Sequence, residues 1–338
     1  MPRVIQFLHG QLSTPPTPNV DLTGRTVLVT GANSGLGLDA AKLLLRLNCS
    51  TIVLACRSIT KGEAAKKEIL ASPTASKSSQ TAKTNIVVFE LDLTSFSSVT
   101  AFADRCKELD RLDSAILNAG VDLVEFTLAE GYETTITVNV ISTFLLATLL
   151  VPTLRLSARR YKITPNIAIV GSAVHFWANS KDLTGPAEGQ ILTTLSDPRK
   201  ADMKARYFLS KLPVMLLVRY LGAILEKSAQ ADPDNKPLVV INNIAPGFCT
   251  TNLFRQHADA STRVMLKIVG RPSEEGARTL VHGGTAGKET NGQYLSECQV
   301  KKASPFVRSA EGDKTARRLW DELTVIYERL RPGCTAVL

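Results

Sequence analysis

The sequence predicts a doubly wound α/β protein in which helices cover both faces of one parallel sheet. Apolar runs rich in valine and isoleucine alternate with segments of helical length, which is the order of a parallel sheet with crossover helices. A glycine-rich turn directly follows the first of these runs. Of the 338 residues, 44% are hydrophobic and 21% charged, which suits a folded body with a sizeable core.

The strands and helices follow from local patterns. Between the first two apolar runs, leucine and alanine recur at helical spacing, and the next helical segment places Glu63 four residues before Lys67. The predicted strands are Thr26–Thr30, Thr51–Ala55, Ile86–Leu91, Ser114–Leu117, Ile167–Val170 and Val239–Ile244. The predicted helices include Leu36–Leu47, Lys61–Leu70, Lys204–Glu226 and Thr315–Arg329.

One domain with extensions and insertions is expected. Residues 23–300 should form the α/β domain, after an N-terminal extension, 1–22, and before a C-terminal helical extension, 301–338, whose amphipathic helix should pack on the body. Residues 72–84 are rich in Ser, Thr, Ala and Lys without periodicity and are predicted to be a surface loop. Residues 173–204, which contain tryptophan, glycine and prolines, are a candidate substrate lid.

Composition argues against several classes of protein. The net charge of +9 is spread along the chain without interleaved aromatic residues, so no nucleic-acid partner is expected. Six cysteines without CxxC pairs or a metal-type spacing to the four histidines predict reduced thiols and no metal site. Pro15, Pro16 and Pro18 break the start of the chain, and the apolar stretch Phe144–Leu154 is interrupted by Pro152. We therefore expect no signal peptide or transmembrane anchor, and a cytoplasmic location.

A glycine-rich turn joins the first predicted strand to the first predicted helix. Glycines let the backbone approach a diphosphate closely, and the helix N-terminus offers unpaired N–H groups and positive potential. Because strand, turn and helix open a βαβ unit, the pattern predicts the phosphate site of a Rossmann-type dinucleotide-binding domain. The residues expected to bind are Gly31, Asn33, Ser34, Gly35, Leu36 and Gly37.

The end of the second strand indicates which dinucleotide is bound. Sites for NAD usually place an acidic side chain there, against the ribose 2′-hydroxyl, but this chain has Cys56 and then Arg57. A guanidinium can hold a 2′-phosphate with two hydrogen bonds, and Lys61 adds a second positive charge. NADP(H) is therefore the expected cofactor. The competing interpretation is that Arg57 and Lys61 are only surface charges at a helix start.

Tyr207 and Lys211 stand four residues apart on a predicted helix, so both side chains lie on one face. A phenol of ordinary pKa is a poor acid or base at neutral pH, and a fixed ammonium nearby would lower the pKa of Tyr207. This spacing predicts an acid/base pair, although such a pair also arises often by chance.

With these residues in place, the sequence resembles the short-chain dehydrogenase/reductase superfamily, from about Thr23 to Leu295. The likeness rests on several motifs that occur in the family's order. They are Thr30-Gly31-x-x-x-Gly35-x-Gly37 as cofactor loop, Asp92-Leu93 as adenine-side pair, Asn118-Ala119-Gly120 as sheet-stabilising turn, Asn139, Ser172, Tyr207-x-x-x-Lys211, and Pro246-Gly247 with Thr251 as the nicotinamide segment.

The resemblance implies a role for each catalytic candidate. Ser172 and Tyr207 would hold the carbonyl oxygen, and Tyr207 would deliver the proton while the nicotinamide supplies a hydride. Lys211 would tune Tyr207 and hold the nicotinamide ribose. Asn139 would hold a water that links Lys211 to solvent. Gly171 departs from the family, because many relatives have a second serine there.

The resemblance also implies a substrate class. The segments Ala55-Cys56-Arg57, Lys61-Gly62-Glu63 and Ser210-Lys211-Leu212 are most similar to the retinol-dehydrogenase-like and fungal secondary-metabolite branches. A lipophilic ketone or aldehyde, of polyketide or secondary-metabolite type, is the implied substrate. Ser172 and Tyr207 are further apart than in compact members, so an elaborated active-site cover is expected.

Several alternatives stay open at this point. The same fold could serve dehydration or cyclisation, or an NADP(H) sensor without turnover, although sensors usually lack the tyrosine or the lysine. His175 could be a general base, but Tyr207 already fills that role. Cys249 is better explained as a small buried residue than as a nucleophile. The resemblance implies a homodimer or homotetramer, and a monomer remains possible.

Overall fold

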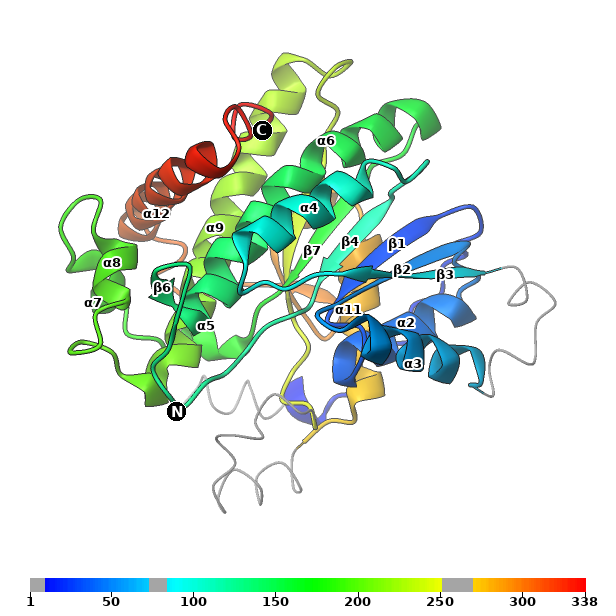
Figure 1. The fold of residues 1–338 in the computed structure, drawn as a ribbon, viewed down its shortest axis with the longest axis horizontal. Helices are drawn as coiled ribbons and strands as arrows, with labels where there is room; N and C mark the ends of the chain where they lie inside the picture. The colour runs from blue at the N-terminus through cyan, green and yellow to red at the C-terminus, as the bar shows by residue number, and fades with distance from the viewer. Residues whose placement is uncertain (1–9, 73–83, 251–269) are drawn as a thin grey trace.

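The computed structural model describes residues 10–72, 84–250 and 270–338 (Figure 1). An eight-stranded sheet runs through the molecule in the order β10-β9-β8-β7-β4-β1-β2-β3. Neighbouring strands pair in parallel, except that β10 is antiparallel to β9. The strands are β1 Thr26–Thr30, β2 Thr51–Cys56, β3 Asn85–Glu90, β4 Ser114–Leu117, β7 Asn166–Val170, β8 Val240–Ala245, β9 Tyr294–Ser296 and β10 Gln299–Lys301.

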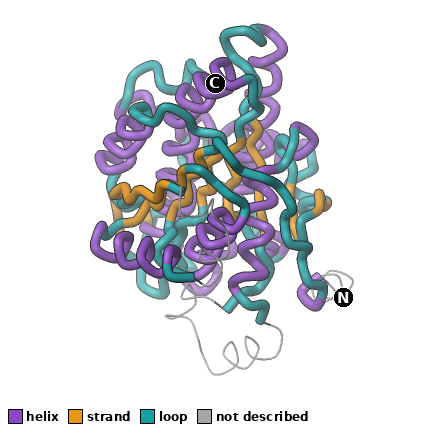
Figure 2. The backbone as a smooth tube through the Cα atoms, turned by 90° about the vertical axis from the view of Figure 1, so that its right-hand side faces the viewer, coloured by secondary structure: helices purple, strands orange, loops and turns teal. Residues whose placement is uncertain are grey.

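Helices cover both faces of this sheet, as Figures 1 and 2 show. On one face lie α4 (Phe96–Cys106), α6 (Thr143–Tyr161) and α9 (Met203–Ala231). On the other lie α2 (Gly35–Arg46), α3 (Ile59–Leu70) and α11 (Ser273–Thr285). The apolar side chains between helices and sheet form two buried clusters, as two-sided burial of a parallel sheet requires. The predicted doubly wound fold is confirmed as a single domain.

The topology places a crevice where ligands bind in such folds. β1 pairs with β2 on one side and with β4 on the other, so the strand order reverses at β1. In open α/β sheets, ligands bind outside the carboxyl ends of the strands at this reversal. The predicted strands are confirmed with ends shifted by about a residue. The three-residue strands β9 and β10 were not predicted, because they are too short to show a pattern.

The long helix that follows the small hairpin of β5 (Leu128–Ala129) and β6 (Tyr132–Glu133) is not regular. It begins as α5 (Thr134–Ile136), passes through a π-helical turn at Thr137–Ser142 and continues as α6. α6 runs through Pro152, the residue that interrupts the apolar stretch Phe144–Leu154. Proline removes one backbone N–H, and here the helix persists because most of it is buried, although Pro152 itself is exposed.

Two helical segments are long and apolar enough to cross a membrane, Thr134–Tyr161 and Met203–Ala231. Their most apolar windows are 94% and 72% buried inside the protein. Such burial is what the core helices of an α/β domain show, because they pack directly on the sheet.

The insertion at 173–204 is packed against the body. It forms a 3₁₀ turn at Ala173–Phe176 and the short helices α7 (Lys181–Thr184) and α8 (Ile191–Leu195), with Leu183 and Ile191 fully buried. Of the predicted loop 72–84, all but the two end residues lie outside the described part of the chain. The C-terminal helix is confirmed as α12 (Ala310–Leu330), and it packs on α9 and α8.

Candidate active site

The glycine turn lies at the carboxyl end of β1 and is as tight as the sequence predicts. A Cβ on Gly37 would lie 2.4 Å from the carbonyl oxygen of Gly31 and 2.7 Å from Nδ2 of Asn118. Ser34 begins α2, but its side chain makes no capping hydrogen bond, and the first turn holds no acidic residue. The start of α2 therefore keeps its positive potential, and a diphosphate fits this cradle.

The segment Asn118-Ala119-Gly120 fastens the end of β4 to the end of β1. Nδ2 of Asn118 donates to the carbonyl oxygen of Thr30 at 2.9 Å, and the backbone N–H of Ala119 donates to Oγ1 of Thr30 at 2.9 Å. A Cβ on Gly120 would lie 3.0 Å from Oδ1 of Asn139 and 3.8 Å from Nζ of Lys211. This turn therefore borders both the glycine loop and the catalytic candidates.

The structure places Arg57 directly after β2 and Lys61 in the first turn of α3, both exposed. In the described residues, neither side chain has a hydrogen bond or ion pair. Cys56 is buried, and burial raises the pKa of its thiol to about 11. Two unpaired cations thus border the end of β2 and could receive a 2′-phosphate.

Asp92 and Leu93 follow β3 on the same edge of the sheet. Oδ1 of Asp92 accepts hydrogen bonds from the N–H and the hydroxyl of Thr94, at 2.9 and 2.7 Å, and Leu93 is buried. The backbone N–H of Asp92 donates to Oγ of Ser98. These hydrogen bonds of Asp92 with Thr94 and Ser98 fix the shape of the turn that the resemblance assigns to the adenine side of the cofactor.

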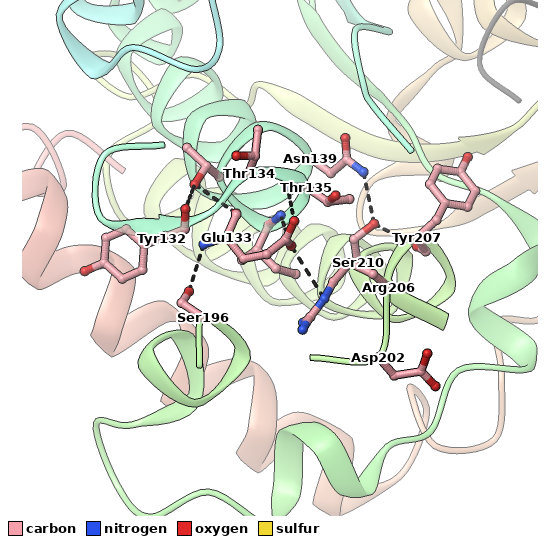
Figure 3. A network of polar contacts seen from close by, with 12 residues as sticks. Tyr132, Glu133, Thr134, Thr135, Asn139, Ser196, Asp202, Arg206, Tyr207 and Ser210 are labelled. Carbon is pink, nitrogen blue, oxygen red and sulfur yellow. Dashed lines mark hydrogen bonds and ion pairs between the residues drawn. The ribbon is translucent and has the colours of Figure 1, made fainter. Parts of the chain in front are cut away.

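Asn139 lies in the π-helical turn and is buried. Its amide pairs with both backbone groups of Val121 at 2.9 Å, and its Nδ2 also donates to Oγ of Ser210 at 3.0 Å. Ser210 in turn donates to the carbonyl oxygen of Tyr207 at 2.7 Å. Figure 3 shows this chain from Asn139 through Ser210 to Tyr207. It fixes α9 relative to the segment after β4.

The other three catalytic candidates meet at the ends of β7 and α9. The phenol of Tyr207 is hydrogen-bonded to the side chain of Ser172. Nζ of Lys211 lies 5.3 Å from the centre of the Tyr207 ring and donates to the carbonyl oxygen of Val170 at 3.0 Å. All four catalytic candidates are thus brought together at the carboxyl edge of the sheet.

Burial governs the protonation of this pair. Burial raises the pKa of Tyr207 well above its ordinary value, and the negative charge of Asp122 raises it further. The hydrogen bond from Ser172 lowers this pKa, but by less. Burial lowers the pKa of Lys211 to about 8, although the negative charge of Asp122 raises it. The expectation that Lys211 lowers the pKa of Tyr207 is therefore wrong for the protein without cofactor. The loss of hydration on burial has a larger effect on the pKa of Tyr207 than the nearby ammonium of Lys211.

His175, the residue set aside as a general base, is buried and takes part in two hydrogen bonds. Its Nδ1 lies 2.8 Å from the carbonyl oxygen of Ser172, and its Nε2 accepts from the N–H of Ser304 at 3.2 Å. Burial lowers the pKa of His175 to about 4, so the ring is neutral at pH 7. It ties the backbone of Ser172 to the C-terminal extension and has no free nitrogen for proton transfer.

Pro246 and Gly247 follow β8, on the same edge of the sheet. A Cβ on Gly276 of α11 would lie 2.6 Å from Leu36 in the glycine loop and 3.5 Å from Cβ of Pro246, so the two loops are neighbours. Cys249 is buried, as expected, and burial raises the pKa of its thiol to about 12. Thr251, the last predicted cofactor residue, lies outside the described residues.

Several residues around the site were missed from the sequence. Ser210 could have been found, because it is three residues from Tyr207 on the same helix. Asp122 could not, since nothing in the sequence places its charge beside α9. Glu133 and Arg206 form a buried ion pair at 3.5 Å, and Figure 3 shows Arg206 leaving α9 in a different direction from Tyr207. Only the fold brings these two together.

Gly171 directly precedes Ser172, and the structure gives a reason for the absence of a side chain there. A Cβ on Gly171 would lie 2.3 Å from Oδ1 of Asn243 on the neighbouring strand. The amide of Asn243 therefore occupies the space that a serine side chain would need. Ser172 is left as the only serine of this pair.

The fold and this edge of the sheet define a Rossmann-type dinucleotide-binding protein with a Ser-Tyr-Lys centre. Comparisons with known proteins agree. The family model "short chain dehydrogenase" matches residues 25–176. The chain is 36% identical over 332 residues to "Short chain dehydrogenase/reductase dmxR8" of Cryptosporiopsis sp. (strain 8999), covering 98% of this chain and 99% of the relative. The protein therefore belongs to the short-chain dehydrogenase/reductase family of oxidoreductases.

Solved structures of low identity share the fold. The "Pseudomonas aeruginosa RhlG/NADP active-site complex" superimposes with a TM-score of 0.58 at 22% identity, covering 81% of this chain and 95% of that chain. The "3-ketoacyl-(acyl-carrier-protein) reductase from Brucella melitensis complexed with NADH" does so with a TM-score of 0.55 at 18% identity, covering 81% and 97%. The first of these proteins is named with NADP and the second with NADH, so the likeness shows the fold and does not indicate which cofactor this chain binds.

Proposed function

We propose that the protein is an NADP(H)-dependent oxidoreductase that reduces a ketone or aldehyde, of a lipophilic, polyketide-like substrate, to an alcohol. The observation that carries the proposal is the hydrogen bond between the Tyr207 phenol and the Ser172 side chain, with the Lys211 ammonium 5.3 Å from the Tyr207 ring. Two hydroxyls beside a buried cation form a site that can hold a carbonyl oxygen and protonate it.

The residues divide the chemistry in a simple way. The chemistry that NADPH supplies when bound is hydride transfer to the carbonyl carbon. Ser172 and Tyr207 donate hydrogen bonds to the carbonyl oxygen, and Tyr207 gives up its proton as negative charge develops there. Because the pKa of Tyr207 is raised, the phenol is fully protonated at neutral pH, as a proton donor in reduction must be. The ammonium of Lys211 stabilises the phenolate left behind.

The choice of NADP(H) rests on Arg57 and Lys61. Both are exposed cations without a partner in the described residues, at the end of β2 and the start of α3. A charge-assisted contact to a 2′-phosphate contributes roughly 1.5–3 kcal/mol, and about 1.4 kcal/mol is tenfold in affinity. We therefore expect NADPH to be preferred over NADH by about ten- to several-hundredfold.

Two variants test this preference. Arg57→Leu should reduce it about tenfold or more, and Cys56→Asp combined with Arg57→Leu should invert it, because a carboxylate accepts from the 2′-hydroxyl and repels the phosphate. Lys67→Leu removes a positive charge from the far end of the same helix and serves as control. The measurement is kcat/KM for both cofactors with a panel of carbonyl compounds, followed by absorbance of the reduced cofactor.

Three results would speak against the proposal. Equal use of NADH and NADPH by the wild type would remove Arg57 from cofactor recognition. Tight binding of NADPH without turnover of any carbonyl would indicate a sensor. Conversion of a substrate without a change in the reduced-cofactor absorbance would indicate dehydration or cyclisation.

A further inference from the structure

The N-terminal extension lies against the turn that follows β8, and Gln11 makes the most specific contact between them. Nε2 of Gln11 donates to the carbonyl oxygen of Phe248 at 2.7 Å, and Oε1 of Gln11 accepts from the N–H of the same residue at 2.9 Å. The two residues are 237 positions apart in the chain. A side-chain amide that pairs with both backbone groups of one residue fixes its position and its orientation together.

Arg271 joins the same three segments from the other side. It is buried, and its Nη1 donates to the carbonyl oxygen of Pro246 at 3.0 Å. Its Nη2 donates at 2.8 Å to the carbonyl oxygens of both Gly10 and Ser13. One guanidinium therefore connects the turn after β8 to both ends of the short N-terminal helical turn. The rigid fork of arginine suits such a multiple contact.

Gly247, the central residue of the turn, is shaped around these two side chains. Its φ is +85°, a conformation that favours glycine. A Cβ at this position would lie 2.8 Å from Nη1 of Arg271 and 2.9 Å from Oε1 of Gln11. The backbone of Arg271 also pairs with this segment, since its N–H donates to the carbonyl oxygen of Phe248 at 2.8 Å. The turn and its two supports thus form one closely packed unit.

This unit borders the cofactor loop. Pro246 and Leu36 of the glycine loop both approach Gly276 of α11, as described above. The extension also continues along α11, because Nη1 of Arg278 donates to the carbonyl oxygen of Pro15 at 3.0 Å. Residues 10–15 of the N-terminal extension therefore pack behind the turn and along α11.

We propose that Gln11 and Arg271 are positioning residues that hold Pro246-Gly247-Phe248 in the shape that receives the nicotinamide half of the cofactor. This inference rests on the proposed function, and on the resemblance in the sequence that assigns the nicotinamide segment to this turn. It gives residues 10–16 of the extension a role in cofactor binding that the family motifs, which begin at β1, do not include. The adenosine half, at Arg57 and Asp92, should be independent of Gln11.

The test compares Gln11→Ala with Leu12→Ala in the full chain. Leu12 is the neighbouring residue and is 76% exposed, so its truncation controls for a change in the extension alone. Two ligands are titrated: NADPH, and 2′,5′-ADP, which lacks the nicotinamide half. Loss of two backbone hydrogen bonds should weaken NADPH binding by about tenfold in Gln11→Ala, with 2′,5′-ADP binding unchanged within about twofold. Leu12→Ala should change neither.

A second measurement tests the positioning without any cofactor. In Gln11→Ala the N–H of Phe248 loses its acceptor, so hydrogen exchange of this amide should become at least about tenfold faster than in wild type. Arg271→Lys keeps the positive charge but removes the planar guanidinium and its several donors. This variant should also weaken the binding of NADPH and leave the binding of 2′,5′-ADP unchanged.

The outcomes separate this inference from the proposed function. Unchanged exchange at Phe248, an unchanged NADPH affinity, or an equal loss of affinity for NADPH and 2′,5′-ADP in Gln11→Ala would each overturn the positioning role. A wild type that binds neither ligand would contradict the proposed function instead, and the exchange experiment would still decide whether Gln11 holds the turn.

Discussion

Tyr207 and Lys211 are recognised from the sequence as an acid/base pair, but their protonation depends on burial. The phenol is kept neutral and the pKa of Lys211 is lowered to about 8, both first of all by the loss of hydration. Burial of this ammonium lowers the free energy of unfolding, so the catalytic arrangement reduces the stability of the protein. The sequence could not show this, because it gives the spacing of the pair but not its depth.

The protonation of Lys211 predicts a pH dependence of stability. Its pKa is lowered from 10.5 to about 8 on folding, so between these values the unfolded chain holds more protons and the free energy of unfolding rises with pH. Lys211→Met cannot titrate. We expect this variant to be more stable than wild type at pH 7 by up to about 3 kcal/mol, with the difference shrinking towards pH 10.

Urea unfolding of both proteins without cofactor at pH 7 and pH 10 checks this. Titration of the buried cysteines and of Tyr207 occurs in both proteins and cancels in the difference. A difference that stays constant between the two pH values, or a wild type that is the more stable at pH 7, would contradict the account of Lys211.

At the scale of single residues, the motifs predicted the members of the site but not the bonds that support them. Tyr207 and Lys211 share a helix face, which spacing alone reveals. Gln11 and His175 act through backbone groups of residues more than a hundred positions away, Phe248 and Ser304. Such partners depend on the folded chain, so no local pattern could have shown them.

At the scale of elements, the insertion between β7 and α9 is held by the C-terminal helix. The carboxylate of Glu322 on α12 accepts hydrogen bonds from the N–H groups of Ile191 and Leu192, both at 2.8 Å, and so caps the start of α8. Arg318 on α12 donates to the carbonyl oxygens of Pro186 and Ala187. The expected substrate lid is therefore anchored to α12 both at the start of α8 and at Pro186 and Ala187 before it.

Glu322→Gln tests this anchor. The amide keeps the size of the carboxylate but loses the charge and one acceptor, so the free energy of unfolding should fall by about 1–2 kcal/mol. Asp321→Asn, the exposed neighbour on the same helix, should change it by less than about 0.5 kcal/mol. Equal effects of the two substitutions in urea unfolding would remove Glu322 as the anchor of α8.

The elements that the sequence predicted are those with a long regular pattern. The strands from β1 to β8 in the main sheet and the helices α2 and α3 appeared close to their expected bounds, whereas α9 ends later, at Ala231, and α12 begins earlier, at Ala310. The π-helical turn at Thr137–Ser142 and the strands β9 and β10 did not, because each is too short to show a period. α6 continues through Pro152 because the helix packs against α4 and the sheet, which overrides the local preference.

At the scale of the whole molecule, both extensions make hydrogen bonds to segments that border one site. The N-terminal extension holds the turn after β8 through Gln11, and the C-terminal extension reaches the backbone of Ser172 through Ser304 and His175. The hydroxyl of Tyr327 on α12 donates at 2.8 Å to the carbonyl oxygen of Ile141, which lies in the same π-helical turn as Asn139. The sequence predicted that the C-terminal helix packs on the body, but not that either extension makes contacts beside the catalytic candidates.

The central claim is that Tyr207 is the proton donor in an NADPH-dependent carbonyl reduction. The most direct measurement is kcat of Tyr207→Phe against wild type, with NADPH and the best substrate of the carbonyl panel, alongside the dissociation constant of NADPH. Tyr220→Phe, on the same helix, is the matched control. We predict a loss of at least about a hundredfold in kcat for Tyr207→Phe with nearly unchanged NADPH affinity, because only the acid is removed. Turnover by Tyr207→Phe within a few-fold of wild type would contradict the claim.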